Sequence, residues 1–166
     1  MMENRVKLTT WIKDILIFLA LLTFIIPVPV RFSVPAVEIK LGDKDFLEHR
    51  TIAVRGWYKI SIFSPCRFWG RIIIFGYPET LNRMTEIEVD ADQGCPLVYK
   101  LEDGTRCCFG DFHAGFAFRR IAIAVFERKE DGGSFSSRNG RCLVARAKSY
   151  EGAVKVLKAY NIVSHK

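Results

Sequence analysis

The apolar stretch Ile15–Ile26 constrains this chain more than any other feature. It reads ILIFLALLTFII, carries no charge, and has a single hydroxyl, on Thr23. Twelve residues of α-helix are only about 18 Å long, whereas the hydrocarbon core of a bilayer is about 30 Å thick. A helix counted from Leu8 to Ile26 would reach about 28 Å. The sequence therefore predicts a single N-terminal transmembrane helix that needs the residues from Leu8 as well as Ile15–Ile26 to span the bilayer.

Polar and aromatic residues just before this stretch suit the edge of a bilayer. Lys13 and Asp14 interrupt the apolar run, and Trp11 lies two residues before Lys13. A lysine can extend its charged end to the headgroups, and tryptophan is enriched at membrane interfaces. Pro27 then ends the helix, because proline cannot continue one. We expect residues 1–30 to form a short basic tail and a membrane anchor.

Two other interpretations of the segment stay open. A basic tail, an apolar stretch and a break at Pro27 also describe a cleaved signal peptide, although no A-x-A cleavage motif follows. The shortness of the charge-free run leaves a buried core helix as the third interpretation.

The charges beside the stretch barely choose its orientation. Three basic residues precede it and three follow it, namely Arg5, Lys7 and Lys13, then Arg31, Lys40 and Lys44. The more basic side of a span normally stays in the cytoplasm. A short tail before a first apolar segment behaves as a signal anchor, so we expect a single-pass membrane protein whose C-terminal domain is extracytoplasmic.

The rest of the chain has the size and patterning of one β-rich domain, residues 36–166, behind a proline-rich stem at 31–35. Thr51–Phe63 alternates between aliphatic residues and a second row that includes Arg55, Trp57 and Lys59, which is the period of a half-buried strand. Trp69–Tyr77 is apolar on both faces and predicts a central strand covered on both sides. Similar short runs follow, one pair of them joined through Asp103-Gly104, a strong hairpin signal.

The C-terminal segment changes to a helical period. Ala153, Val156, Leu157 and Tyr160 fall on one face of a helix expected at 150–161, and Ser149 is a suitable N-cap. Seven or eight short strands joined by short turns favour antiparallel pairing. The predicted fold is mainly β: a transmembrane helix, then an antiparallel sheet or small barrel with the C-terminal helix on one face or closing one end.

One cluster has residue types that could carry chemistry: Cys107, Cys108, Asp111 and His113. A thiol beside an imidazole can act as a nucleophile with its base, and the same groups can bind a metal ion. In a regular strand, however, Cys107 and His113 would lie about 20 Å apart, so they meet only if Gly110 turns the chain back. Thiols buried in a strand are the alternative interpretation, and the chain's five cysteines cannot all pair.

An aromatic cluster gives the second candidate site. Trp57 and Trp69 belong to it and would bind an apolar or sugar ligand if the sheet enclosed a pocket. The competing interpretation is a packed core, which large aromatics normally fill. Trp57 also shares a strand face with Arg55 and Lys59, so either a second layer covers it or it marks an interaction surface.

The expected function follows from location more than from chemistry. The sequence contains no G-x-S-x-G, H-E-x-x-H or phosphate-loop motif, so it assigns no catalytic residue and no cofactor. We expect a non-enzymatic binding or accessory module at the membrane surface, with the bilayer and either a membrane protein or an anionic surface polymer as partners. The anchor argues against nucleic acid. A small-ligand carrier or sensor, and a Cys/His enzyme or metal-binding domain, remain the alternatives.

Overall fold

The computed structural model describes residues 11–15, 17–18, 26–61, 65–81, 83–89, 94–100, 104–127 and 134–163. Its elements, in chain order, are eight strands, two short 3₁₀ helices and a C-terminal α-helix. They are β1 (Val28–Lys40), β2 (Asp43–Lys59), β3 (Cys66–Ile74), η1 (Pro78–Thr80), β4 (Thr85–Val89), β5 (Cys95–Lys100), β6 (Arg106–Ala114), η2 (Phe116–Phe118), β7 (Ile121–Val125), β8 (Arg141–Ala145) and α2 (Tyr150–Ala159).

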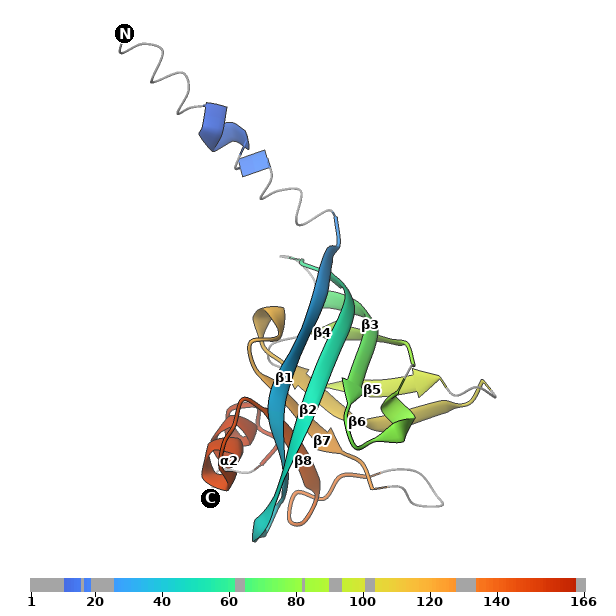
Figure 1. The fold of residues 1–166 in the computed structure, drawn as a ribbon, viewed down its shortest axis with the longest axis vertical. Coiled ribbons are helices and arrows are strands. Elements are labelled where there is room, and N and C mark those ends of the chain that lie inside the picture. Colours follow the sequence, from blue (N-terminus) through green and yellow to red (C-terminus); the bar gives the residue numbers. More distant parts are fainter. Residues whose placement is uncertain are drawn as a thin grey trace.

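The eight strands form one antiparallel sheet that curls into a nearly closed barrel (Figure 1). Their order is β4-β3-β2-β1-β8-β7-β6-β5. Consecutive strands therefore pair from β1 to β4 and from β5 to β8, and β8 pairs with β1. The two end strands, β4 and β5, meet through a hydrogen bond of 3.0 Å from the Thr85 hydroxyl to the Val98 carbonyl. The mainly β, antiparallel, barrel-like prediction with a C-terminal helix is therefore confirmed.

The barrel interior is filled by side chains. Alternate residues of each strand point inward, because successive side chains leave opposite faces of a sheet. The largest of the fully buried ones are aromatic: Phe68, Tyr99, Phe112 and Phe118, each at most 2% exposed. An eight-stranded barrel is only just wide enough for such a core. The filling argues against the alternative in which the interior carries a ligand.

Phe118 closes one end of the barrel. It sits in η2 with a left-handed backbone (φ 57°), as does Ala117 before it (φ 52°). This turn directs the Phe118 ring among four other rings, with centroid distances of 5.3 Å to both Tyr58 and Phe68. Aromatic pairs at such distances add to ordinary hydrophobic burial. The side chain therefore works as a plug at this end.

Helix α2 packs on the outside of the barrel, across β1, β7 and β8 (Figure 1). Ala153 and Leu157 are fully buried against outward residues such as Val37 and Val144. The predicted cap is confirmed, since the Ser149 hydroxyl accepts from the Gly152 N–H at 3.2 Å. The helix thus covers one side of the barrel and leaves the outer surface of β2 and β3 open.

That open surface corrects the prediction for Trp69–Tyr77. The inward side of β3 is buried as expected, but on the outer side Ile73 is half-buried and Phe75 is 52% exposed. The strand is therefore covered on one side only. Strand β3 ends at Ile74, and the apolar run continues into a turn.

The predicted stem, residues 31–35, lies inside β1 instead. The carbonyl of Pro35 accepts from the Arg146 N–H at 2.8 Å, so its main-chain groups point toward the β8 side. Pro29 has the same parity and the same direction. Strand β8 pairs only with residues 36–40 of β1, so neither proline removes a ladder hydrogen bond. The prolines of this segment, which the sequence suggested would prevent a strand, are therefore compatible with one.

The N-terminal anchor falls largely outside the described residues. Within the predicted span, residues 11–15 and 17–18 are helical, and they lie beyond the end of the barrel at which β1 begins (Figure 1). Positions 8–10, 16 and 19–25 are not described. No helix in the described ranges has the length and apolar character needed to cross a membrane. The transmembrane helix therefore stays a prediction.

Candidate functional site

Trp57 and Trp69 lie side by side on the outside of the barrel. They are direct partners in the pairing of β2 with β3. The Trp57 side chain is 49% exposed, and Trp69 is half-buried. Because inward positions on these strands belong to residues such as Tyr58 and Phe68, neither indole lines the interior. If these tryptophans bind a partner, they bind it on the outer surface.

A row of three arginines runs beside the two tryptophans. Arg31 of β1 pairs in register with Arg55 of β2, which pairs with Arg71 of β3. All three are exposed, and none makes an ion pair with any residue that the structure describes. We call the outer surface that carries these arginines together with Trp57 and Trp69 the arginine face. The sequence showed only the neighbours along β2, because the row exists only once three strands are in register.

Among the described residues, acidic side chains border the arginine face on its β4 side. Glu88 forms an ion pair of 3.1 Å with Arg67, and both side chains are about 60% exposed. Glu86 lies opposite Trp69. Strand β4 begins at Thr85, which pairs with Gly70, so the arginine row lies past the end of the β3–β4 pairing. The arginine row therefore has no direct cross-strand partner on β4.

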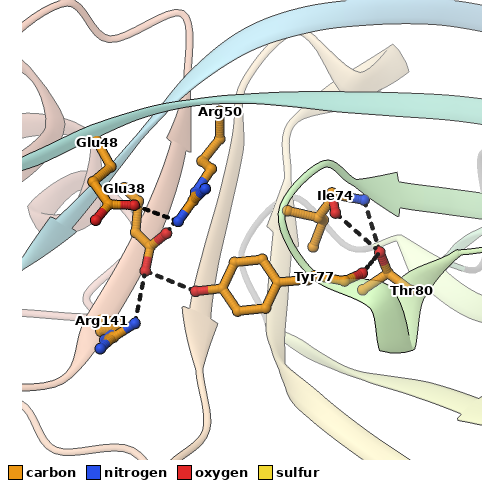
Figure 2. A network of polar contacts seen from close by, with 7 residues as sticks. All are labelled: Glu38, Glu48, Arg50, Ile74, Tyr77, Thr80 and Arg141. Atoms are coloured by element: carbon orange, nitrogen blue, oxygen red, sulfur yellow. Dashed lines mark hydrogen bonds and ion pairs between the residues drawn. The ribbon is translucent and has the colours of Figure 1, made fainter.

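A second polar cluster closes the barrel at the end opposite Phe118 (Figure 2). Its centre is Glu38, an inward residue of β1 with no exposed surface. One carboxylate oxygen accepts from the Tyr77 hydroxyl at 2.7 Å and lies 3.5 Å from an Arg141 Nη. The other accepts from the Arg50 Nε at 2.8 Å. Arg50 also pairs with Glu48 and lies over the Tyr77 ring.

The electrostatics of this cluster favour a fixed, fully paired state. The hydrogen bond to Glu38 raises the pKa of Arg50 above its usual value. Burial, followed by the hydrogen bond to Glu38, raises the pKa of Tyr77, which keeps its hydroxyl protonated as a donor. A buried carboxylate is tolerated when donors satisfy it in this way. We interpret the cluster as a polar plug that joins β1, β2, β8 and the turn after β3.

Tyr77 is held in place by the turn that it begins. The Thr80 hydroxyl accepts from the Ile74 N–H at 2.9 Å and lies 2.8 Å from the Tyr77 carbonyl (Figure 2). Thr80 is fully buried. Sequence reasoning missed this cluster; its only trace was that Glu38 falls in the same alternating row as Val34 and Ala36.

The four residues of the predicted metal or catalytic cluster all lie on β6. A bulge in the β5–β6 register leaves Cys107 opposite the inward Tyr99, while Cys108, Asp111 and His113 face outward. Burial raises the pKa of Cys108 and lowers that of His113, whose Nδ1 is buried without a partner. The strand therefore separates Cys107 from the other three side chains.

The structure gives the metal site no geometric support. In the described ranges, no group of three or more histidine, cysteine, aspartate or glutamate side chains is arranged to hold a metal ion. All five cysteines lie in these ranges, and none of them forms a disulfide. His113 packs instead against Tyr160, with ring centroids 5.5 Å apart. The metal and catalytic assignments stay predictions.

A shallow groove of about 570 Å³ runs along the exposed side of α2. Its apolar floor includes Tyr150 and Val154, and its rim carries Lys44, Lys155 and Lys158. The groove contains no convergent set of polar groups of the kind that usually orients a small ligand.

Comparison of the chain with protein-family models, with curated proteins and with solved structures gives no match.

Proposed function

We propose that this protein is a single-pass membrane protein that presents its β-barrel at the membrane surface as a non-enzymatic binding or accessory module. The observation that carries the proposal is the exposure of large apolar side chains in the N-terminal helical residues. Trp11, Ile12, Ile15, Ile17 and Phe18 are each between 49% and 71% exposed. Transfer of such side chains from water to an apolar environment gains about 1.5–3 kcal/mol each.

The barrel supports the same function. Its interior is filled, one end is plugged by Phe118 and the other by the Glu38 cluster. Such a body offers its outer surface to a partner and has little internal space for a substrate. The surface that α2 leaves open also carries the arginine face.

Extraction of membranes with alkaline carbonate tests the anchor in the full chain. We expect the intact wild-type chain in the membrane pellet, with its N-terminal residues present by mass spectrometry. A variant with Ile15→Asp and Phe18→Asp should move to the supernatant, because each charge at the helix centre costs about 3 kcal/mol of insertion. The matched control is Phe75→Asp, which places a charge on an exposed aromatic of the barrel and should stay in the pellet.

Two results would refute the proposal. Wild-type chain in the carbonate supernatant would show that the N-terminal segment does not anchor it. A membrane-free mature chain that lacks residues 1–30 would show a cleaved signal peptide. Protease added to intact cells tests sidedness separately: we expect digestion of the barrel, and protection would place it in the cytoplasm.

A further inference from the structure

We propose that the arginine face binds the anionic phospholipid headgroups of the membrane beside which the anchor holds the barrel. The shared chemistry is a phosphate oxyanion recognised by guanidinium groups, and the source that we infer is the bilayer surface. The placement of the arginine face beside a membrane rests on the proposed function, but binding of anionic lipid by this face can be tested without the anchor.

The first argument is the unpaired charge of the row. Arg31, Arg55 and Arg71 are direct cross-strand partners, which places their Cβ atoms about 5 Å apart on one surface. Like charges directly opposite one another destabilise a sheet. No carboxylate of a described residue pairs with any of the three. The row is therefore electrostatically incomplete, and an external anion would complete it.

The second argument is the residue type. Guanidinium groups bind phosphate through two parallel hydrogen bonds, and they are more weakly hydrated than an ammonium group. Each can therefore exchange water for a phosphodiester with little loss. Three adjacent guanidiniums in one exposed row match a layer of headgroups better than they match a single enclosed anion.

The third argument is the order of residues from the anchor. Ile26 is apolar and exposed, and β1 begins at Val28. On the outer surface of β2 and β3, the first register row from that end pairs exposed Lys59 with Arg67. The next row holds Pro29, Trp57 and Trp69, and the third holds the three arginines. Two residues of strand advance about 6.6 Å. Basic rows therefore lie on both sides of the two tryptophans, a residue type that is enriched at membrane interfaces, in the part of the barrel near the anchor.

The distance from the anchor is also suitable. Arg31 is five positions after Ile26, which is at most about 18 Å of extended chain. β1 begins at the barrel end that faces the N-terminal segment (Figure 1). The Glu38 cluster lies at the other end of the same strand. The arginine face therefore lies in the part of the barrel nearer the anchor, beyond the Lys59–Arg67 row.

Vesicle flotation of full-length chains separates the face from the anchor. The anchor is weakened by Ile15→Asp and Phe18→Asp, and the vesicles contain phosphatidylcholine alone or with three parts in ten of phosphatidylglycerol. About a fivefold gain in affinity is typical for each basic residue near an anionic surface, so three arginines give about 100-fold. We expect the anchor-weakened chain to float with the anionic vesicles only, and to be released by 0.5 M NaCl, which shortens the screening length.

Adding Arg31→Gln, Arg55→Gln and Arg71→Gln should abolish this anionic binding. The matched control carries Arg106→Gln, Arg138→Gln and Lys155→Gln, three exposed cations elsewhere on the domain, and loses the same net charge. It should bind as before. Because the arginine substitutions relieve like-charge repulsion, the thermal midpoint should be unchanged or raised, which excludes misfolding as the cause.

Three outcomes would overturn the inference. They are unchanged flotation of the arginine variant, equal loss in the matched control, and tighter binding of a 20-nucleotide oligothymidine that the same three substitutions abolish. Failure of wild-type chain to float with phosphatidylcholine vesicles would instead count against the anchor. The two proposals can therefore fail separately.

Discussion

The Glu38 cluster makes a strong prediction about stability. Replacement of Glu38 by Gln keeps the size of the side chain but removes its charge and turns one acceptor into a donor. The amide would then face Arg50 Nε or the Tyr77 hydroxyl, both of which donate to Glu38 at 2.8 Å and 2.7 Å. Removing one partner of a buried ion pair costs about 3–5 kcal/mol.

The expected loss lies at the lower end of that range. The side chains of Arg50 and Arg141 are 24% and 50% exposed, so both can recover water when the carboxylate is gone. We expect Glu38→Gln to lower the free energy of unfolding by about 3 kcal/mol. For a chain of this length, that corresponds to a fall in Tm of about 6–12 °C.

Denaturant unfolding of the full chain in detergent, followed by tryptophan fluorescence, measures this loss. The matched control is Glu88→Gln, which removes a carboxylate from an ion pair with both side chains about 60% exposed and should cost at most about 1 kcal/mol. A second variant, Arg50→Gln, allows a double-mutant cycle, and the double variant should lose less than the sum of the two. A Glu38→Gln chain as stable as the Glu88→Gln control would refute the plug interpretation.

Three further predictions concern the barrel core and the thiols. Phe118→Ala should lower the free energy of unfolding by about 3–5 kcal/mol, because it removes a ring that packs among four others. Phe75→Ala on the exposed surface should cost under about 1 kcal/mol. Equal losses in denaturant unfolding would contradict the role of Phe118 as a plug. Brief alkylation of the native chain should modify exposed Cys108 before buried Cys142, as read by peptide mass spectrometry, and early labelling of Cys142 would contradict its burial. Burial raises the pKa of Cys95 and Cys142 to about 12, whereas the pKa of an unfolded thiol is near 8.5. Burial of the two neutral thiols therefore stabilises the fold fully below about pH 8.5, and this stabilisation falls as the pH rises toward 12. The denaturation midpoint should therefore decrease between pH 8 and 10.5, and less so in a Cys95→Ala/Cys142→Ala chain.

The strands and the C-terminal helix could be predicted because their signals are local. Alternation in Thr51–Phe63 correctly placed Ile52, Val54 and Tyr58 inward and Trp57 outward. The Ser149 cap and the helical period of the last segment were sufficient for α2. These features depend on residues within a few positions of one another, so they can be recognised in a single sequence.

The arginine face and the buried Glu38 cluster could not be predicted because they depend on register. Arg31 and Arg71 are forty residues apart, and Glu38 and Arg141 are 103 apart. Nothing in the sequence fixes which residues of β1, β3 and β8 stand opposite one another. The extent of β1 was missed for a related reason: whether Pro35 disrupts a strand depends on which neighbour its nitrogen faces.

The direction of the two prolines in β1 also affects how copies of the protein meet. Strand β8 pairs with residues 36–40, so residues 28–34 of β1 have an edge that no described strand occupies. Open edges invite another chain to add a strand. On this edge Pro29 and Pro35 offer no N–H, which leaves Arg31 and Ser33 as donors, and Arg31 brings a charge that repels its counterpart in a second copy. At high local concentration, such an edge should keep neighbouring barrels from joining into a continuous sheet.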